Sequence, residues 1–421
     1  MVYKHKGQVG VPAMEMVDDI IDIQKCGVES VRANAVVNTF MEHKKLKLSK
    51  TKCHKIHCGK KSINCPELKV HNEKMHETNE EKYLGDFINT NAKHAATVSH
   101  RRARGFGILA DIIQILNHIR DNKRRIQIGL HLRQAWFVNS VLLNMEVWHN
   151  VLKKDTDVFL NLDHYLMRII TGAHSKVPIE FLYLETAAIP IDYILASRRV
   201  NYLYNILNKE DNELVKCVYI AQKVNPVKGD WCHTVKTDME LIKLNMKDCE
   251  ITSMSKNKFK RHVKKYMTDA AFAYLKSEQS EHSKIRDINY KDFRLQPYLK
   301  SDKISHEEAS TIFNMRASTV NGFKMCFPNM YKNDTLCKLG CKNNDSISHA
   351  FQCRELGPQF NENYNDIFNS EKQMKQVAVE FIRRCGLRTA ILAARASQGL
   401  QLLDTSTRAA AGGAGGRARD C

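Results

Sequence analysis

The sequence predicts an α+β fold that is mainly helical. Strand-like segments are short and lie within about the first ninety residues, whereas apolar residues recur at helical spacing over much of the chain beyond residue 92. A compact group of cysteines and one histidine follows between residues 321 and 356. With 421 residues, of which 43% are hydrophobic, the chain can bury more than one core, so two or three domains are expected.

The chain is strongly basic, because 65 Lys and Arg residues outnumber 46 Asp and Glu residues and give a net charge of +19. This excess favours an anionic partner, above all nucleic acid, although a soluble basic protein without such a partner has the same composition. The sequence contains no apolar run of membrane-spanning length and no secretory signal at its N-terminus. We therefore expect an intracellular protein of the nucleus and cytoplasm, with its 13 cysteines reduced or bound to metal.

The first distinctive element is an acid pair, Asp18 and Asp19, between the apolar segments 9–16 and 20–26. These segments predict the two strands of a hairpin with the acids at its turn. Vicinal carboxylates on such a turn can hold Mg²⁺, which prefers oxygen ligands. Taken alone, an acid pair is also typical of a solvated loop or a helix cap. A helix over residues 30–48 and short strands near 53–58, 67–71 and 82–88 are predicted to follow.

Helices are predicted for most of the region from 92 to 225, where segments 106–119 and 129–152 carry broad apolar faces. A further helix is predicted over residues 255–279, where Phe259, Val263, Met267 and Ala271 form one apolar stripe. Its opposite face is rich in lysine and arginine, which is typical of a solvated face or of a nucleic-acid contact. The Ala/Gly/Arg-rich end, 405–421, has no periodic apolar face and is predicted to be disordered.

The cysteine and histidine group reads Cys337-x3-Cys341-x7-His349-x3-Cys353. Four soft ligands at short spacings are typical of a closed tetrahedral zinc site, and the metal would order a loop too small to have its own core. Cys326 lies eleven residues before Cys337 and could replace one ligand. The alternative is that these cysteines are small buried apolar residues.

The order of these features resembles that of a known enzyme family. The hydrophobic-x-Asp-Asp-hydrophobic pattern in a predicted hairpin resembles the polymerase palm of reverse transcriptases. In "LKLSKTKCHKI", Lys52 matches the lysine of the palm, with Lys50 as the competitor, and "EKYLGDFI" is similar to the hairpin that grips the primer end. Segments 100–112, 130–148 and 166–207 are similar to the helical thumb and post-thumb of non-LTR retrotransposon reverse transcriptases. The resemblance covers roughly residues 1–360.

The resemblance implies a partial antiparallel palm sheet followed by a helical thumb region and a small zinc knuckle. The expected boundaries are residues 1–90 for the C-terminal part of the palm and 91–225 for the thumb and post-thumb. A basic helical connector over 226–320, a zinc knuckle over 321–360 and a tail over 361–421, largely disordered at its end, would follow. The implied activity is that of an RNA-directed DNA polymerase, a nucleotidyltransferase acting on an RNA template and a DNA primer.

The resemblance also implies roles for individual residues. Asp18 and Asp19 would hold Mg²⁺ or Mn²⁺ and act in catalysis with Lys52, and Tyr83, Leu84 and Gly85 would form the primer grip. The relatives carry a similar Cys-Cys-His-Cys cluster, often with two residues between the first cysteines, where this chain has three. The expected nucleic-acid contacts are Arg101, Arg102, Arg104, Lys123, Arg124, Arg125, Lys258, Lys260, Arg261, Lys264 and Lys265.

The third catalytic acid and the fingers of this family lie upstream of the acid pair, yet only seventeen residues precede Asp18. Since two-metal chemistry needs that acid, we expect the chain to be a fragment that is inactive alone and that partners an upstream reverse transcriptase segment. Two alternatives stay open from the sequence. The chain could be a nucleic-acid-binding protein without chemistry, or a decayed element that is rarely translated.

Overall fold

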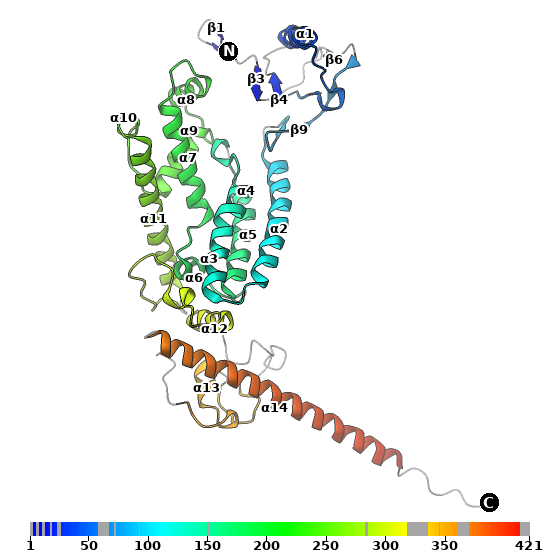
Figure 1. The fold of residues 1–421 in the computed structure, drawn as a ribbon, viewed down its shortest axis with the longest axis vertical. Helices are drawn as coiled ribbons and strands as arrows, with labels where there is room; N and C mark the ends of the chain where they lie inside the picture. The colour runs from blue at the N-terminus through cyan, green and yellow to red at the C-terminus, as the bar shows by residue number, and fades with distance from the viewer. Residues whose placement is uncertain are drawn as a thin grey trace, which may run out of the picture. The chain divides into compact units, whose positions relative to one another are not determined.

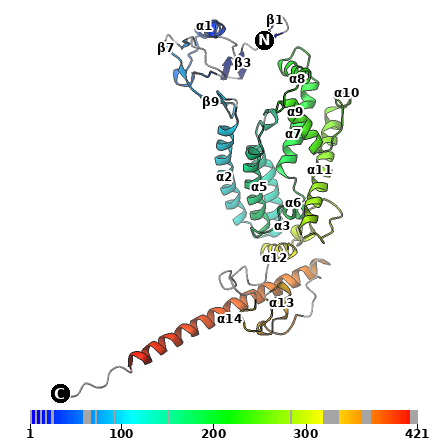
Figure 2. The same cartoon turned by 180° about the vertical axis from the view of Figure 1, so that it is seen from behind.

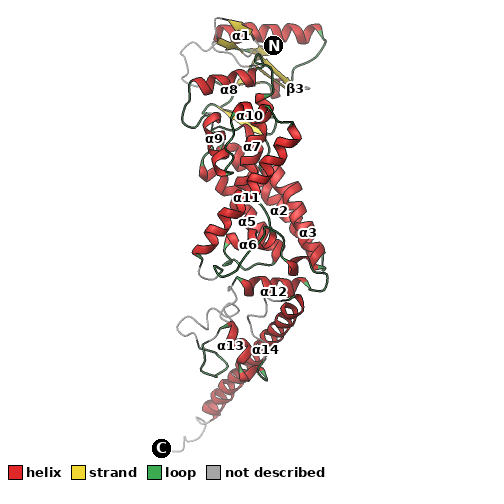
Figure 3. Ribbon diagram, turned by 90° about the vertical axis from the view of Figure 1, so that its left-hand side faces the viewer, coloured by secondary structure: helices red, strands yellow, loops and turns green. Residues whose placement is uncertain are grey.

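The computed structural model describes residues 3–5, 8–10, 13–16, 19–22, 27–57, 67–70, 73–91, 93–149, 151–282, 285–317, 336–344, 346–360 and 370–412. The chain forms two compact units that alternate along the sequence. Unit 1 comprises 1–112, 131–165 and 189–274, and unit 2 comprises 113–130, 166–188 and 275–421. The described residues are mainly helical, and all their strands lie before residue 90, as the sequence predicted (Figures 1 and 3).

The described strands pair two at a time. The antiparallel pairs are β1 (Tyr3–His5) with β2 (Gln8–Gly10), β3 (Ala13–Met16) with β4 (Asp19–Asp22), β6 (Lys69–Val70) with β7 (Glu73–Lys74), and β9 (Glu80–Tyr83) with β10 (Asp86–Asn89). The fifth pair, β5 (His54–Lys55) with β8 (His76–Glu77), is parallel. Small, mostly antiparallel strand pairs are therefore present among the described residues, whereas the partial palm sheet stays a prediction.

Helix α1 (Gly27–His43) begins three residues earlier and ends five residues earlier than predicted, and the short 3₁₀ turn η1 (Lys50–Lys52) follows it. The side chains of Asn34 and Asn38 donate to the carbonyl of Lys69, at 2.9 and 3.0 Å, and so attach α1 to β6. Of the apolar residues on α1, Met41 is buried, whereas Phe40 is exposed. The apolar pattern of this segment thus predicts its helix but not the burial of its whole apolar face.

The helices of unit 1 pack around a core formed chiefly by three helices. Besides the strands, α1 and η1, the elements wholly in unit 1 are η2, a π-helix (Arg133–Val138), α4 (Asn139–Val141), η3 (Met145–Val147), α7 (Ile191–Leu207), α8 (Leu214–Val224), α9 (Trp231–Leu241) and α10 (Asp248–Thr252). Helices α2 (Ala95–Asn117), α5 (Lys153–Thr171) and α11 (Lys256–Glu281) continue from one unit into the other. The core joins α7, α9 and α11, three helices that Figure 2 labels. It includes Val200, Val235 and the predicted stripe of Phe259, Val263, Met267 and Ala271.

Buried ion pairs connect the helices of unit 1. Arg133 donates to both carboxylate oxygens of Asp163, at 2.6 and 2.7 Å, and to the carbonyl of Ile189 at 2.8 Å. Arg199 donates to the carboxylate of Asp238. Because removing one member leaves a buried charge without its partner, such pairs tolerate little movement of the helices that carry them.

Unit 2 contains α6 (Ile179–Thr186), η4 (Pro297–Lys300), α12 (His306–Arg316), α13 (Ile347–Gln352), η6 (Arg354–Leu356) and α14 (Glu371–Gly412), together with most of α3 (Asn122–Leu132). At its centre the carboxylate of Glu185 is fully buried. It accepts hydrogen bonds from the hydroxyls of Tyr290 and Tyr298 and from Arg316. Helix α14 continues to Gly412, so residues 405–412 are helical where the sequence predicted a disordered end.

Candidate metal centre and nucleic-acid surface

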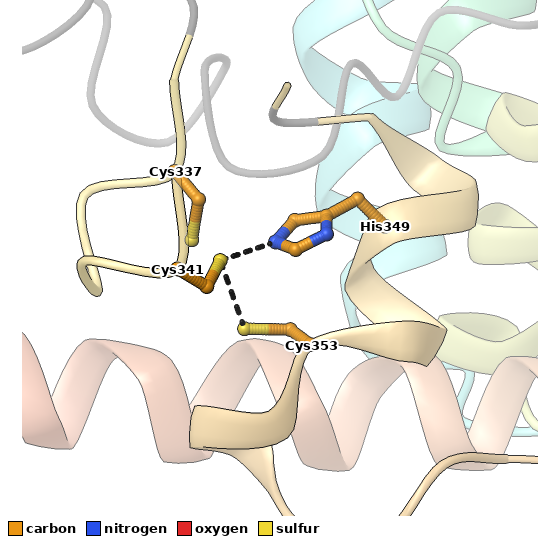
Figure 4. A group of neighbouring side chains, drawn as sticks. All are labelled: Cys337, Cys341, His349 and Cys353. Carbon is orange, nitrogen blue, oxygen red and sulfur yellow. Dashed lines mark hydrogen bonds between the residues drawn. The ribbon is translucent and has the colours of Figure 1, made fainter. Parts of the chain in front are cut away.

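The four predicted soft ligands lie together in unit 2 (Figure 4). One ligand atom from each of Cys337, Cys341, His349 and Cys353 can be chosen so that all lie within 4.8 Å of one another. The Sγ of Cys341 is 3.0 Å from the Nε2 of His349 and 3.9 Å from the Sγ of Cys353. Two sulfurs bound to one tetrahedral zinc ion are separated by about 3.8 Å, and a sulfur and a nitrogen by about 3.5 Å. The cluster could hold a metal ion and is compatible with zinc.

Local structure explains how the first two ligands meet. Residues Leu336 and Asn344 form an antiparallel bridge, and the amide of Cys337 donates to the carbonyl of Asn343 at 2.8 Å. Between them the chain turns through Gly340, whose φ of 96° lies in the region that favours glycine. The three-residue spacing that distinguishes this cluster is thus accommodated by a glycine with the backbone freedom that the turn requires.

Helix α13 supplies the other two ligands. Ser346 caps the helix, because its hydroxyl accepts a hydrogen bond from the amide of His349 at 3.1 Å. Residues four apart lie on the same face of a helix, so the x3 spacing brings His349 and Cys353 to one side. Cys353 ends the helix, and its amide donates to the carbonyl of His349 at 2.8 Å. Cys326, the alternative ligand, lies outside the described residues.

The protein environment of the cluster opposes ionised thiols in the absence of a cation. Burial raises the pKa of the Cys353 thiol to about 12, and the neighbouring Cys337 acts in the same direction. Burial also raises the pKa of Cys337, whereas the positive charge of Arg388 acts to lower it. A bound divalent cation reverses this preference, because the thiolate is the form that coordinates metal. The site therefore suits a metal better than it suits free thiolates.

The predicted primer-grip segment is a tight hairpin. Strands β9 and β10 pair from Tyr83 with Asp86, and the turn places both Leu84 (φ 50°) and Gly85 (φ 90°) in the left-handed region. Two positive φ angles in a two-residue loop are typical of a type I′ turn, whose twist matches that of the flanking strands. The side chain of Asn144 donates to the carbonyl of Leu84 at 3.2 Å. Leu84 itself is exposed at the tip.

An acid next to this turn anchors the hairpin, and sequence reasoning did not identify it. Asp86 accepts hydrogen bonds from Arg101 on α2 and from the indole nitrogen of Trp148, the latter at 3.4 Å. The guanidinium carbon of Arg101 also lies 4.7 Å from the centre of the Trp148 ring. In the sequence, Asp86 is visible only as an acid directly after Leu84 and Gly85, and nothing there indicates that Arg101 and Trp148 are its partners.

Two of the predicted nucleic-acid contacts are corrected by their burial. Arg101 is only 2% exposed, because it pairs with Asp86. Arg125 is buried on α3, where it donates to the carbonyls of Leu116 and Ile169. Both arginines lie on the inner face of their helices and are used to join elements, so in this conformation they are not available to phosphates.

The other predicted cations remain at the surface. Arg102, Arg104 and Arg124 are exposed, and Lys123 is half-buried. In the first ten residues of α11 the exposed cations are Lys256, Lys258, Lys260, Arg261, Lys264 and Lys265. Among the described residues no acid forms an ion pair with any of these six α11 side chains. This face of α11 therefore presents uncompensated positive charge to solvent.

The predicted catalytic residues are described only in part. Asp18 lies outside the described residues. Asp19 is the first residue of β4 and pairs with Met16 of β3, so a hairpin forms at the predicted place, but its described strands are shorter than the predicted arms 9–16 and 20–26 and Asp19 lies in a strand. Lys52 is exposed at the end of η1, beside the competing Lys50. The Mg²⁺ site of the two acids stays a prediction.

No helix in the described part of the chain is both long enough and apolar enough to cross a membrane. Comparison of the chain with family models, curated proteins and solved structures gives no match.

Proposed function

We propose that this chain binds RNA and DNA as part of an RNA-directed DNA polymerase of the non-LTR retrotransposon type. The observation that carries the binding proposal is the exposed basic face of α11. Its six cations include Lys258 and Lys265, which are two helical turns apart and therefore lie on one side. Uncompensated cations in a row bind phosphates by releasing the counterions of the nucleic acid.

The metal centre supports the same proposal. We propose that Zn²⁺ is held by Cys337, Cys341, His349 and Cys353, because three thiolates and an imidazole are ligands that zinc accepts in structural sites. Since all four positions are taken by protein, such a site has no open position for chemistry. Its role would be to order residues 336–353 as a surface that contacts the nucleic acid.

The hairpin of β9 and β10 supports the polymerase part of the proposal. Its exposed Leu84 lies in a tight two-residue turn, which suits a role in holding the end of a primer. Asp18 and Asp19 would hold Mg²⁺ at the hairpin of β3 and β4, with RNA as template and DNA as primer. An alternative that fits the basic face equally well is nucleic-acid binding without chemistry.

Binding is tested with a labelled RNA–DNA hybrid, and affinity is followed by fluorescence anisotropy over a series of salt concentrations. Wild-type log affinity should fall linearly with log salt. Lys258→Ala with Lys265→Ala should make that slope shallower by about 1–2, because each lost phosphate contact contributes about 0.7–0.9. Lys228→Ala with Lys236→Ala removes the same charge from other exposed positions and should leave the slope unchanged. Equal slopes for the two double variants would exclude α11 as the binding face.

The polymerase part is tested by primer extension on an RNA template with Mg²⁺. The chain is assayed with and without a polypeptide that carries the fingers and the first catalytic acid of a reverse transcriptase. Extension that disappears in Asp18→Ala supports the proposal. Binding of the hybrid without extension in either mixture would instead favour the non-catalytic alternative.

A further inference from the structure

Helix α14 forms one side of the metal centre's own core. The ring of Phe381 lies 5.9 Å from that of Phe351 on α13, and both side chains are buried. Val377 and Ala378 on α14 are also buried, as is Leu356 in η6. The segment that carries the ligands therefore shares an apolar core with α14.

Polar contacts reinforce this packing at the level of the backbone. Arg384 is 1% exposed and donates to the carbonyl of Ala350 at 3.2 Å and to that of Pro358 at 2.5 Å. Its Nε donates to Glu380 at 2.5 Å, so the guanidinium charge is compensated within α14. The two carbonyls lie on either side of Cys353 in sequence. A single buried side chain of α14 thus holds the turn that carries this ligand.

One turn further along α14, Arg388 is fully buried. Residues four apart lie on the same face of a helix, so Arg388 lies on the face of α14 from which Arg384 contacts the segment that carries the ligands. Three thiolates and a neutral imidazole around a divalent ion carry a net charge of −1, the sum of −3 and +2. A buried guanidinium is stabilised by a buried anion nearby. Arg388 and the metal-bound cluster therefore have complementary charges in the same interior.

We propose that α14 is an integral part of the metal centre, with Arg384 and Arg388 as positioning residues that couple metal binding to the docking of residues 374–388. Metal binding forms the anionic cluster whose charge complements that of Arg388, while Arg384 holds the backbone on either side of Cys353, and docking of α14 in turn orders the ligands. Loss of the metal then releases α14 from α13. The inference rests on the proposed occupation of this site by zinc.

The coupling is tested in the full chain by hydrogen exchange of residues 374–388. Zinc-loaded protein should show protected amides there, and removal of zinc with EDTA should raise exchange in this segment. Residues 194–207 of α7, in unit 1, serve as the internal control and should not respond. Unchanged exchange of residues 374–388 after zinc has been removed would overturn the inference.

Variants test the role of the buried charge. Arg388→Met should weaken zinc binding by about 10–100-fold, the usual effect of losing a group that supports metal ligands. Arg388→Lys should recover part of this loss because it keeps the charge. Lys372→Met, which removes an exposed charge from the same helix, should bind zinc as the wild type does. Wild-type zinc affinity in Arg388→Met would overturn the proposed role of Arg388.

Cobalt substitution separates a positioning role from unfolding. At saturating Co²⁺ the thiolate charge-transfer bands of Arg388→Met should match those of the wild type, because the four ligands are unchanged. Altered bands would show that the variant has lost the ligand set and would count against a positioning role.

Different results affect the two proposals differently. A wild-type chain that binds no zinc overturns both this inference and the zinc part of the proposed function. Zinc binding without any response of α14 overturns this inference alone. A zinc-dependent response of α14 in a chain without affinity for the RNA–DNA hybrid supports the inference and refutes the proposed function.

Discussion

Replacing Glu185 with glutamine tests how far unit 2 depends on one buried carboxylate. One carboxylate oxygen accepts from the Tyr290 hydroxyl and from Arg316, and the other accepts from the Tyr298 hydroxyl and again from Arg316, with the two arginine contacts at 3.0 and 3.1 Å. An amide offers only one acceptor oxygen. Whichever way it is oriented, its NH₂ group faces one tyrosine hydroxyl and one guanidinium N–H.

The magnitude follows from these contacts. A tyrosine hydroxyl can rotate and accept from the amide, but the guanidinium N–H cannot, so one charged hydrogen bond is lost at a cost of about 1.5–3 kcal/mol. The charge of the buried Arg316 also loses its partner. Breaking a buried ion pair by removing one member costs about 3–5 kcal/mol in total. That is a large fraction of the 5–15 kcal/mol that typically stabilises a domain.

Urea denaturation followed by far-ultraviolet circular dichroism, together with hydrogen exchange of α6 and α12, measures the effect. Tryptophan fluorescence alone is unsuitable, because Trp136, Trp148 and Trp231 all belong to unit 1. Glu180→Gln is the matched control on the same helix. Glu180 pairs at 3.1 Å with the partly exposed His282, so its loss should cost less than about 1 kcal/mol. Similar losses for the two variants would refute the assignment of Glu185 as the central polar residue of unit 2.

Three further predictions concern pH, the hairpin and helix packing. Burial lowers the pKa of His306 to about 4, so the unfolded chain binds a proton below about pH 6.5 that the folded chain does not bind. Stability should therefore fall by about 1–2 kcal/mol as the pH drops from 6.5 towards 4, allowing for partial exposure, and His306→Gln should flatten this dependence in urea titrations. Asp86→Asn should destabilise unit 1 by about 2 kcal/mol, because its buried partner Arg101 keeps its charge. Tryptophan fluorescence during urea unfolding measures this loss. An unchanged urea midpoint would contradict the anchoring role of Asp86. Gly129→Ala should cost about 1–3 kcal/mol of stability, because the added Cβ would lie 2.8 Å from the Ile170 side chain. In Gly107→Ala the added Cβ meets no atom within 4 Å, so this variant should stabilise its helix by up to about 1 kcal/mol. Thermal unfolding followed by circular dichroism compares the two variants.

Periodic and local features were predictable from the sequence because they depend on nearby residues. The buried stripe of α11 and the assembly of Cys337 with its three partners follow from short-range spacing, whereas the hairpin around Leu84 and Gly85, where the residue pattern predicted one strand, was expected only from the resemblance. The hairpin needs only a two-residue turn. The metal cluster needs a turn and one helical repeat, so its geometry is contained within seventeen residues.

Features that depend on distant partners were not predictable. Arg101 and Arg102 are adjacent, yet one is buried on Asp86 and the other is exposed, because the docked face of α2 decides which of them turns inward. The alternation of the chain between two units also depends on contacts between segments far apart in sequence. Helix α14 has a buried arginine, Arg384, that donates to two carbonyls more than twenty residues away. A charge count in a sequence window cannot distinguish a phosphate-binding arginine from one that joins two helices.

Glu185 and the pair of Asp18 and Asp19 are all acids that lie within apolar sequence. They differ in the number of hydrogen-bond donors that the chain would need to stabilise their carboxylates. A single buried carboxylate can be satisfied by the chain itself, and Glu185 receives four hydrogen bonds from three side chains. Two adjacent carboxylates repel each other, so the same donors would have to offset twice the charge. A divalent cation supplies that charge at one point. Apolar flanks alone therefore do not identify a functional acid, and an adjacent second acid adds a reason to expect a metal, which for Asp18 and Asp19 stays a prediction.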